Sequence, residues 1–208
     1  KMQMIERSMS LLPSNLSLTS PAAVVTLAAF ALLLLGLFFK RPGDDVSGLR
    51  SAVADRLSLI PDVARHKWNT AAAIADPARE QRLIEAAVVK GRQIGLPDHV
   101  TRAAIEAQII ASKQMQEQLI QSWRDKGQGT FASVPNFMEE TRPKIEEATD
   151  RLIRELAVAS RMLKTCPGAA ALREPPSLDL TSDLVWATAV EGLIRSAGGP
   201  TPDACPPR

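Results

Sequence analysis

The chain has 208 residues, and 25 Lys and Arg stand against 23 Asp and Glu, so its formal net charge is +2. So small a positive excess argues against nucleic acid as a partner, because nucleic-acid-binding domains usually carry a strongly basic surface. Tyr is absent and Phe is scarce, whereas Ala, Leu, Ile, Arg, Glu and Gln abound, a composition that favours helix over sheet.

Residues 21–39 form an apolar stretch, PAAVVTLAAFALLLLGLFF. Its length lies at the lower edge of what spans a bilayer as a helix. No clear A-x-A cleavage site precedes Lys40, so we favour an uncleaved signal-anchor helix over a cleaved signal peptide. Basic residues on both sides leave its orientation open. We therefore divide the chain into a flank (1–20), this segment, a linker (40–45) and a folded domain (46–208).

The first two helices of the domain are expected at 46–69 and from Asp76 to Gly95. Pro61 interrupts the first helix and predicts a kink or a one-turn break there. The second helix has Asp76 as its N-cap, Pro77 as its first residue and Gly95 as its left-handed C-cap. The apolar stripe of the first helix comprises Leu49, Val53, Leu57 and Ile60.

Three further helices are expected at 98–123, 136–164 and 182–196. Loops should connect them over 125–135, which is rich in Gly, Gln and Ser, and over the Pro-rich segment 166–176. Inward positions on the last two helices are Ile145, Leu152, Leu156 and Leu163, then Leu184, Val185, Val190, Leu193 and Ile194. No strand pattern of useful length is visible, so we predict a single all-α helical bundle.

The two cysteines, Cys166 and Cys205, lie far apart, without a C-x-x-C pair or a nearby histidine. This argues against a metal site, and we expect none. They are either two buried free thiols or, in an exported domain, one disulfide, and we favour the disulfide. The expected location is periplasmic or secreted, with anchoring to the inner membrane by 21–39 if that segment is retained.

Cationic side chains recur at helical spacing in the first half of the domain. Arg56 and Lys67 stand eleven residues apart, close to three turns, so they share one helix face. Arg79 follows just inside the second helix. Polar groups follow at one-turn intervals on the third helix: Gln108, Ser112 and Gln116. Three inward cations are costly unless an anion neutralises them, so we infer a small dianionic ligand.

The sequence offers few candidate residues for acid–base or covalent catalysis. There is no nucleophile elbow, Gly-rich phosphate loop or H-E-x-x-H motif, and neither His66 nor His99 has a triad context. What remains is catalysis by positioning and electrostatics, which needs only fixed cations and hydrogen-bond donors. We expect no cofactor.

Three sequence elements together resemble the exported, gamma subclass of the all-helical (AroQ-type) chorismate mutases. They are D-R-L-x-L-x-P-D-V-A-x-x-K-W-N at 55–69, I-A-D-P-A-R-E at 74–80 and A-Q-I-I-A-S-K-Q-M-Q at 107–116, with a further echo in T-R-P-K-I at 141–145. The resemblance is looser beyond these, where the two cysteines carry it. It implies the AroQ-type bundle and a homodimer in which each chain builds its own site.

The reaction implied by this resemblance is the Claisen rearrangement of chorismate to prephenate, a step of aromatic amino acid biosynthesis in the shikimate pathway. It is unimolecular and needs no proton transfer. The enzyme must hold a diaxial, chair-like substrate and stabilise charge on the breaking ether oxygen. The implied roles are carboxylate binding by Arg56, Arg79 and Arg142, with Ser112 beside a carboxylate; donation to the ether oxygen by Lys67 and Gln116; and acceptance from the ring hydroxyl by Glu80, with Asp76 as the second candidate.

Two positions depart from the pattern of some family members. Gln116 stands where some carry Glu, which must be protonated to donate, whereas glutamine donates at any ordinary pH. Activity should therefore not fall steeply between neutral and mildly alkaline pH. Leu83 stands where some gamma-class proteins place a polar residue, so Glu80 would take over hydroxyl recognition.

Two other functions compete with this reading. One is a non-catalytic binding or sensor domain for an aromatic dicarboxylate on the same fold, since fold alone does not decide function. The presence of Lys67 and Gln116 favours catalysis, because carboxylate binding alone needs only the arginines. The other is a structural bundle at the membrane that contacts protein partners, which predicts that Arg56, Lys67 and Arg79 are exposed and dispensable.

Overall fold

The computed structural model describes residues 45–176 and 182–205, and every regular element in these ranges is helical. The predicted all-α architecture is therefore confirmed for this part of the chain. The predicted signal or anchor segment 21–39 lies outside the described residues. Among the helices that are described, none combines the length and the apolar character that crossing a membrane requires.

The first predicted helix is divided into α2 (Ser47–Ser58) and α3 (Ile60–Thr70), which confirms the break expected near Pro61. Pro61 has no N–H to donate to the carbonyl of Leu57, and its ring crowds that carbonyl, so the interruption falls just before it, at Leu59. All four residues of the predicted apolar stripe are buried: Leu49, Val53, Leu57 and Ile60.

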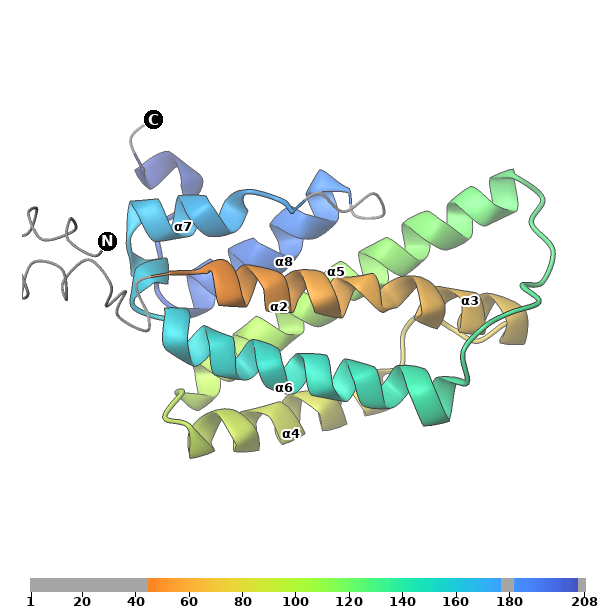
Figure 1. The fold of residues 1–208 in the computed structure, drawn as a ribbon, viewed down its shortest axis with the longest axis horizontal. Coiled ribbons are helices and arrows are strands. Elements are labelled where there is room, and N and C mark those ends of the chain that lie inside the picture. The colour runs from red at the N-terminus through yellow and green to blue at the C-terminus, as the bar shows by residue number, and fades with distance from the viewer. Residues whose placement is uncertain (1–44, 177–181, 206–208) are drawn as a thin grey trace, which may run out of the picture. The chain divides into compact units, whose positions relative to one another are not determined.

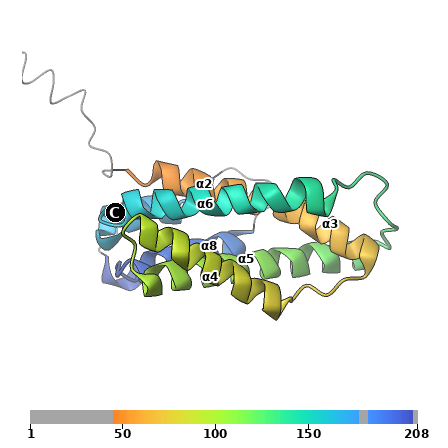
Figure 2. The ribbon, with the colours of Figure 1, turned by 90° about the horizontal axis from the view of Figure 1, so that it is seen from below.

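Helix α4 (Pro77–Gln93) begins and ends where the sequence predicts. Oδ1 of Asp76 accepts the backbone N–H of Arg79 at 3.0 Å, and Gly95 turns the chain with a φ of +83°. Helix α5 (Asp98–Asp125) follows and contacts α3, α4 and α8. Helix α6 (Arg142–Ala159) packs instead against α2 and α4 (Figures 1 and 2).

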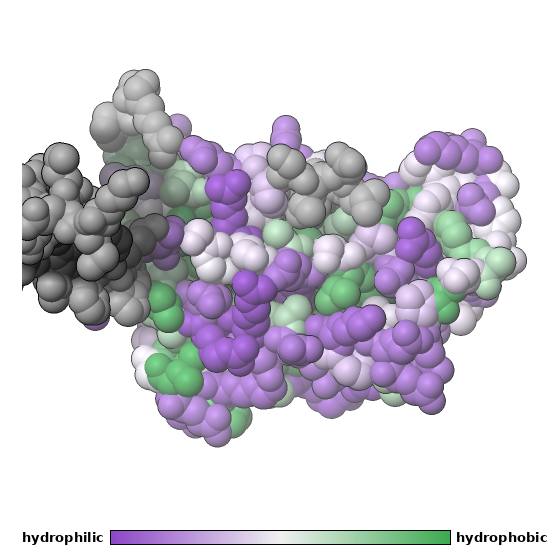
Figure 3. Space-filling view, viewed as in Figure 1, coloured by the Kyte–Doolittle hydropathy of each residue, from purple (hydrophilic) through white to green (hydrophobic). Residues whose placement is uncertain are grey.

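The fourth predicted helix is wrong as a single element. The structure divides it into a π-helical turn η1 (Phe137–Thr141), α6 (Arg142–Ala159) and a 3-10 turn η2 (Met162–Lys164). Pro143 cannot donate to the carbonyl of Glu139, and the wider turn of η1 precedes it. Helix α6 packs beside α2, and the face that they form is mostly hydrophilic, because their apolar sides point inward (Figures 1 and 3).

The expected loop at 166–176 is also wrong, because most of it forms α7 (Cys166–Arg173). Oγ1 of Thr165 caps this helix by accepting the N–H of Gly168 at 3.2 Å. Pro167 lies in the first turn, where its missing N–H costs nothing. The buried side chain of Leu172 then packs this short helix against the core.

The last helix, α8 (Asp183–Ser196), lies where the sequence predicts and packs closely against α5. Oγ of Ser182 caps it by accepting the backbone N–H of Val185. Gly192 permits the approach, since a Cβ there would lie 2.0 Å from that of Ala107. The inward assignment of Leu184 is wrong: it is 62% exposed, and Trp186 fills the core instead at 2%. The reason is register, because Leu184 falls on the outer side of the first turn while Trp186 faces α7.

Cys166 and Cys205 form a disulfide with their Cα atoms 5.5 Å apart. The bond ties the start of α7 to the residue that follows the 3-10 turn η3 (Pro202–Ala204). It therefore fastens the tail that follows α8, at a place away from α3 and α4.

Candidate functional site

The residues singled out by their spacing converge on one pocket between α2, α3, α4, α5 and α6. Its charged and polar lining comprises Arg56, Lys67, Asp76, Arg79, Glu80, Ser112, Lys113 and Gln116. Four cations thus face two carboxylates, a formal excess of two positive charges. The pocket is therefore complementary to a dianion, which is the ligand charge inferred from the sequence.

Arg56 is the deepest cation of the pocket and is only 3% exposed. Its Nη1 donates to Oγ of Ser112 at 2.8 Å and to the carbonyl of Gln108 at 3.2 Å, and its Nε donates to Oγ1 of Thr149 at 3.3 Å. No carboxylate pairs with it in the described part of the chain. Burial lowers the pKa of Arg56 to about 10. The guanidinium is therefore held by neutral oxygens of α5 and α6, and no carboxylate of the described residues neutralises its positive charge.

Lys67 projects from α3 towards the segment that leads into α4. Its Nζ donates to the carbonyl of Ile74. Its pKa is lowered, first by burial and then by the charge of Arg79, while Asp76 and Glu80 act in the opposite direction. One of its three N–H groups is occupied by Ile74, so further donors remain for a ligand.

Arg79 and Glu80 lie in the first turn of α4. The guanidinium of Arg79 lies over the ring of Phe137, 5.0 Å from its centroid. Burial is the main reason that the pKa of Arg79 is lowered, and the nearby charge of Arg142 is the next. Glu80 receives Nζ of Lys113 at Oε2, 2.9 Å away, and the backbone N–H of Asp76 at Oε1, 3.2 Å away.

Ser112 and Gln116 are buried on the face of α5 that borders the pocket. Nε2 of Gln116 donates to the carbonyl of Ser112 at 2.9 Å and keeps a second hydrogen. Its Oε1 is buried without a hydrogen-bond partner within the described residues. Gln108 does not line the pocket, because its Nε2 donates to the carbonyl of Ala189 on α8. It therefore joins two helices instead of facing a ligand.

The part of the chain that builds this pocket resembles known proteins. Residues 48–117 match the family described as chorismate mutase type II. These residues run from the start of α2 past Gln116 on α5. This region is similar to the type II chorismate mutases. The match confirms the resemblance drawn from the sequence motifs.

Relatives and solved structures extend this family likeness. The secreted chorismate mutase of Yersinia pestis is 26% identical over 117 residues, which are 56% of this chain and 60% of that protein. A crystal structure of chorismate mutase from Burkholderia thailandensis is 27% identical, with a TM-score of 0.63, and covers 71% of this chain and 98% of that one. The Burkholderia phymatum enzyme, at 22% identity and a TM-score of 0.67, shows the fold, with 74% and 98% covered.

Arg142 is the predicted site residue that the structure does not place in the pocket. Its Nε pairs with Oε1 of Glu146 at 3.2 Å on the partly exposed start of α6. It lines a neighbouring groove between α4 and α6. This groove shares Arg79, Leu83 and Ile145 with the pocket that contains Arg56 and Lys67. Its part in ligand binding therefore stays a prediction.

Three residues at or beside the pocket were not anticipated from the sequence. Lys113 follows Ser112 in a quoted motif, and its adjacency to a nominated residue was the available signal. Thr149, which supports Arg56, interrupts the apolar face of α6 as a fully buried polar residue. No feature of the sequence indicated Phe137, because the segment before Pro143 was expected to be ordinary helix.

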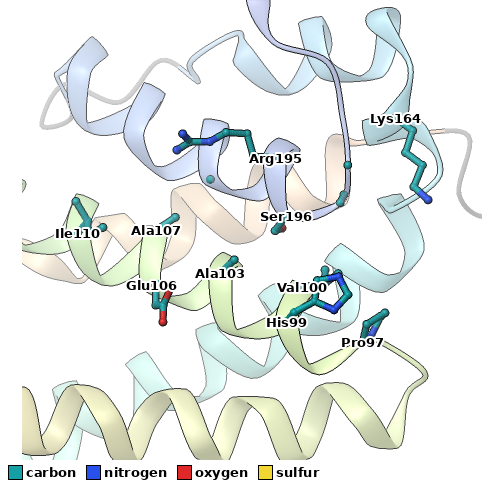
Figure 4. Close-up of a pocket in the computed structure, with 13 residues that line it drawn as sticks. Pro97, His99, Val100, Ala103, Glu106, Ala107, Ile110, Lys164, Arg195 and Ser196 are labelled. Carbon is teal, nitrogen blue, oxygen red and sulfur yellow. The ribbon is translucent and has the colours of Figure 1, made fainter.

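A second depression lies between the start of α5 and the end of α8 (Figure 4). Its charged side chains, His99, Glu106, Lys164 and Arg195, extend from different sides and do not converge. None of the residues given a site role from the sequence lines this depression. We therefore place the functional site of this chorismate mutase relative in the cationic pocket.

Proposed function

We propose that this protein is a chorismate mutase that converts chorismate to prephenate. The observation that carries the proposal is the pocket in which four cations face two carboxylates, within the region that matches the family. Chorismate is a dicarboxylate, and its rearrangement needs no proton donor or acceptor. A site built from fixed cations and amide donors is suited to such a step.

In this proposal Arg56 and Arg79 bind the substrate carboxylates, with Ser112 beside one of them. Arg56 is held by three neutral oxygen acceptors, so its position does not depend on the ligand. Because no protein carboxylate neutralises it, the substrate supplies the missing negative charge. Guanidinium groups bind carboxylates with two parallel hydrogen bonds, which fixes orientation as well as charge.

Lys67 and Gln116 are proposed to donate to the ether oxygen on which negative charge develops. Each has at least one donor hydrogen that its present partner does not occupy. Their positions are set before the reaction, Lys67 by the carbonyl of Ile74 and Gln116 by that of Ser112. Donors fixed in advance stabilise the transition state without reorganising during it.

Glu80 is the better candidate of the two carboxylates for the ring hydroxyl. It lies in the pocket between Lys113 and the N-terminus of α4, and its two oxygens, which accept Nζ of Lys113 and the N–H of Asp76, each keep a further lone pair for a hydroxyl donor. Arg142 would join the substrate by leaving Glu146. Exposed ion pairs of this kind contribute little, so the exchange costs little.

Export of the domain is supported by the disulfide and by the likeness to the secreted chorismate mutase of Yersinia pestis. Anchoring by 21–39 and a homodimer remain proposals without support from the described residues.

The decisive experiment measures chorismate consumption and prephenate formation by the purified full chain. Lys67→Met should abolish turnover without lowering the melting temperature, and the exposed Lys126→Met is the matched control. A folded wild type that does not turn chorismate over would refute the proposal. Calorimetry would then show whether chorismate or prephenate binds, as the sensor alternative expects.

A further inference from the structure

Arg79 differs from the other pocket cations in how it is held. Arg56, Lys67 and Lys113 each donate to protein oxygens. The guanidinium of Arg79 makes no hydrogen bond or ion pair within the described residues, and its neighbour is the ring of Phe137 at 5.0 Å. An aromatic face, and no oxygen atom, therefore supports this cation.

Phe137 is itself fixed from two sides. Its ring is stacked on that of His66, with the centroids 4.5 Å apart and the planes at 11°. Its backbone begins η1, where Oδ1 of Asn136 accepts the N–H groups of Met138 and Glu139 at 3.0 and 3.2 Å. The ring is thus a stationary platform between α3, which carries Lys67, and the start of α4.

An aromatic platform holds a guanidinium in a way that suits a ligand-binding arginine. A cation–π contact contributes about 0.5–2 kcal/mol and leaves the N–H donors of the guanidinium unoccupied. A protein carboxylate in the same place would compete with the ligand for those donors. It would also cancel the charge that attracts a dianion to the pocket.

We propose that Phe137 is a positioning residue for Arg79, holding its guanidinium towards the pocket while leaving its donors free for a substrate carboxylate. This inference rests on the proposed function for its kinetic consequence. The geometry of the contact can be tested in the free protein.

The kinetic test compares Phe137→Leu with Phe137→Tyr. Leucine removes the aromatic face, so KM for chorismate should rise about five- to tenfold, the loss expected for one cation–π contact. Tyrosine retains the face and should keep KM within about twofold. Phe131→Leu is the matched control, because that ring contacts Trp123 and Arg65, and it should leave KM unchanged.

A purely structural role would lower the melting temperature of both leucine variants and leave both KM values unchanged, which would overturn the proposal. In an Arg79→Gln background, which places no cation over the ring, Phe137→Leu should change KM far less than in the wild type. Equal effects in the two backgrounds would also refute it. If Phe137→Leu does not fold, Phe137→Met provides the same comparison.

The second readout does not depend on turnover. The Nε–Hε signal of Arg79, assigned by its absence in Arg79→Lys, should lie upfield through the ring current of Phe137. In Phe137→Leu it should move to the ordinary arginine position. An unmoved signal overturns the inference, whereas an inactive wild type with the expected displacement refutes only the proposed function.

Discussion

Arg56 and Arg173 both lie largely inside the domain, but they differ in their partners. Arg173 is paired with a carboxylate, whereas Arg56 is not. In the C-terminal region, Nε of Arg173 pairs with Oε1 of Glu191 at 2.5 Å, and its Nη2 donates to the carbonyl of Pro200 at 2.8 Å. In the pocket region, Arg56 is more deeply buried yet has only neutral acceptors. A cation that stabilises the fold has its counter-charge within the protein, whereas Arg56 lacks one.

The same contrast extends to the elements around each arginine. The C-terminal region is fastened by a disulfide and by Trp186, whose Nε1 donates to the carbonyl of Arg173 at 3.2 Å. The pocket region instead holds half-buried Lys67 and Arg79, whose pKa values are lowered chiefly by burial. Stability and binding are therefore concentrated in different parts of one bundle.

The largest effect is expected for Arg56→Met, which removes the buried charge from the pocket region. Loss of a fixed transition-state or substrate contact should lower kcat/KM by about a hundred- to a thousandfold. The free energy of unfolding should not fall, and an increase of about 1–2 kcal/mol is expected because an uncompensated buried charge is removed. Oγ of Ser112 and Oγ1 of Thr149 keep their own acceptors at Gln108 and Ile145.

Arg173→Met is the matched control for that variant. It leaves the half-buried carboxylate of Glu191 without its partner, so stability should fall by about 1–3 kcal/mol. The kcat/KM of the folded fraction should stay near that of the wild type. Chemical denaturation and steady-state kinetics measure both quantities, and a destabilised Arg56→Met would contradict the comparison.

Reduction of the Cys166–Cys205 disulfide has the next largest expected effect. The bond spans a sequence separation of 39 residues, and its loss should cost roughly 3–4 kcal/mol on loop-entropy grounds. Turnover at room temperature should change much less, because none of the residues that line the pocket lies on α7, on α8 or in the tail that follows. Thermal melts and kinetics with and without reductant test this, and equal loss of both would show that the two regions are coupled.

The pH dependence of activity distinguishes Gln116 from a titrating donor. In the wild type, turnover should stay level from neutral to mildly alkaline pH and then fall as the pH rises through the lowered pKa of Lys67, since Lys67 must be charged to donate. In Gln116→Glu the donor must be protonated, so activity should fall about tenfold per pH unit above its own pKa. A wild-type collapse between neutral and mildly alkaline pH that precedes the titration of Lys67 would exclude this assignment of Gln116.

Ala71→Gly should have the smallest effect. Ala71 ends α3 with a φ of +53°, the left-handed region that costs a non-glycine residue about 1 kcal/mol. Glycine should raise stability by about 0.5 kcal/mol, because its own chain entropy offsets part of the gain. Ala72→Gly is the control and should not stabilise. Denaturation midpoints compare them, and an unchanged kcat would show that this turn does not tune Lys67.

Helix ends that depend on local chemistry could be predicted from the sequence alone. Asp76 and Gly95 act through neighbouring backbone groups, so their type and spacing suffice. Arg56 and Lys67 both line the pocket, as their spacing suggested, but from two helices, α2 and α3, and not from one face of a continuous helix. The segment 166–176 was expected to be a loop because a proline either ends a helix or begins one. Thr165 before Pro167 was a local sign of a helix start, and the packing of Leu172 against the core completes the short helix.

Contacts between distant segments were decided by the tertiary structure. The sequence determined which residues carry charge and on which helix face each one stands. It could not determine that Lys113 pairs with Glu80 across 33 residues or that Phe137 lies under Arg79. Those outcomes depend on how α3, α4, α5 and η1 approach one another, because long side chains choose among several partners by distances that only the packed domain sets.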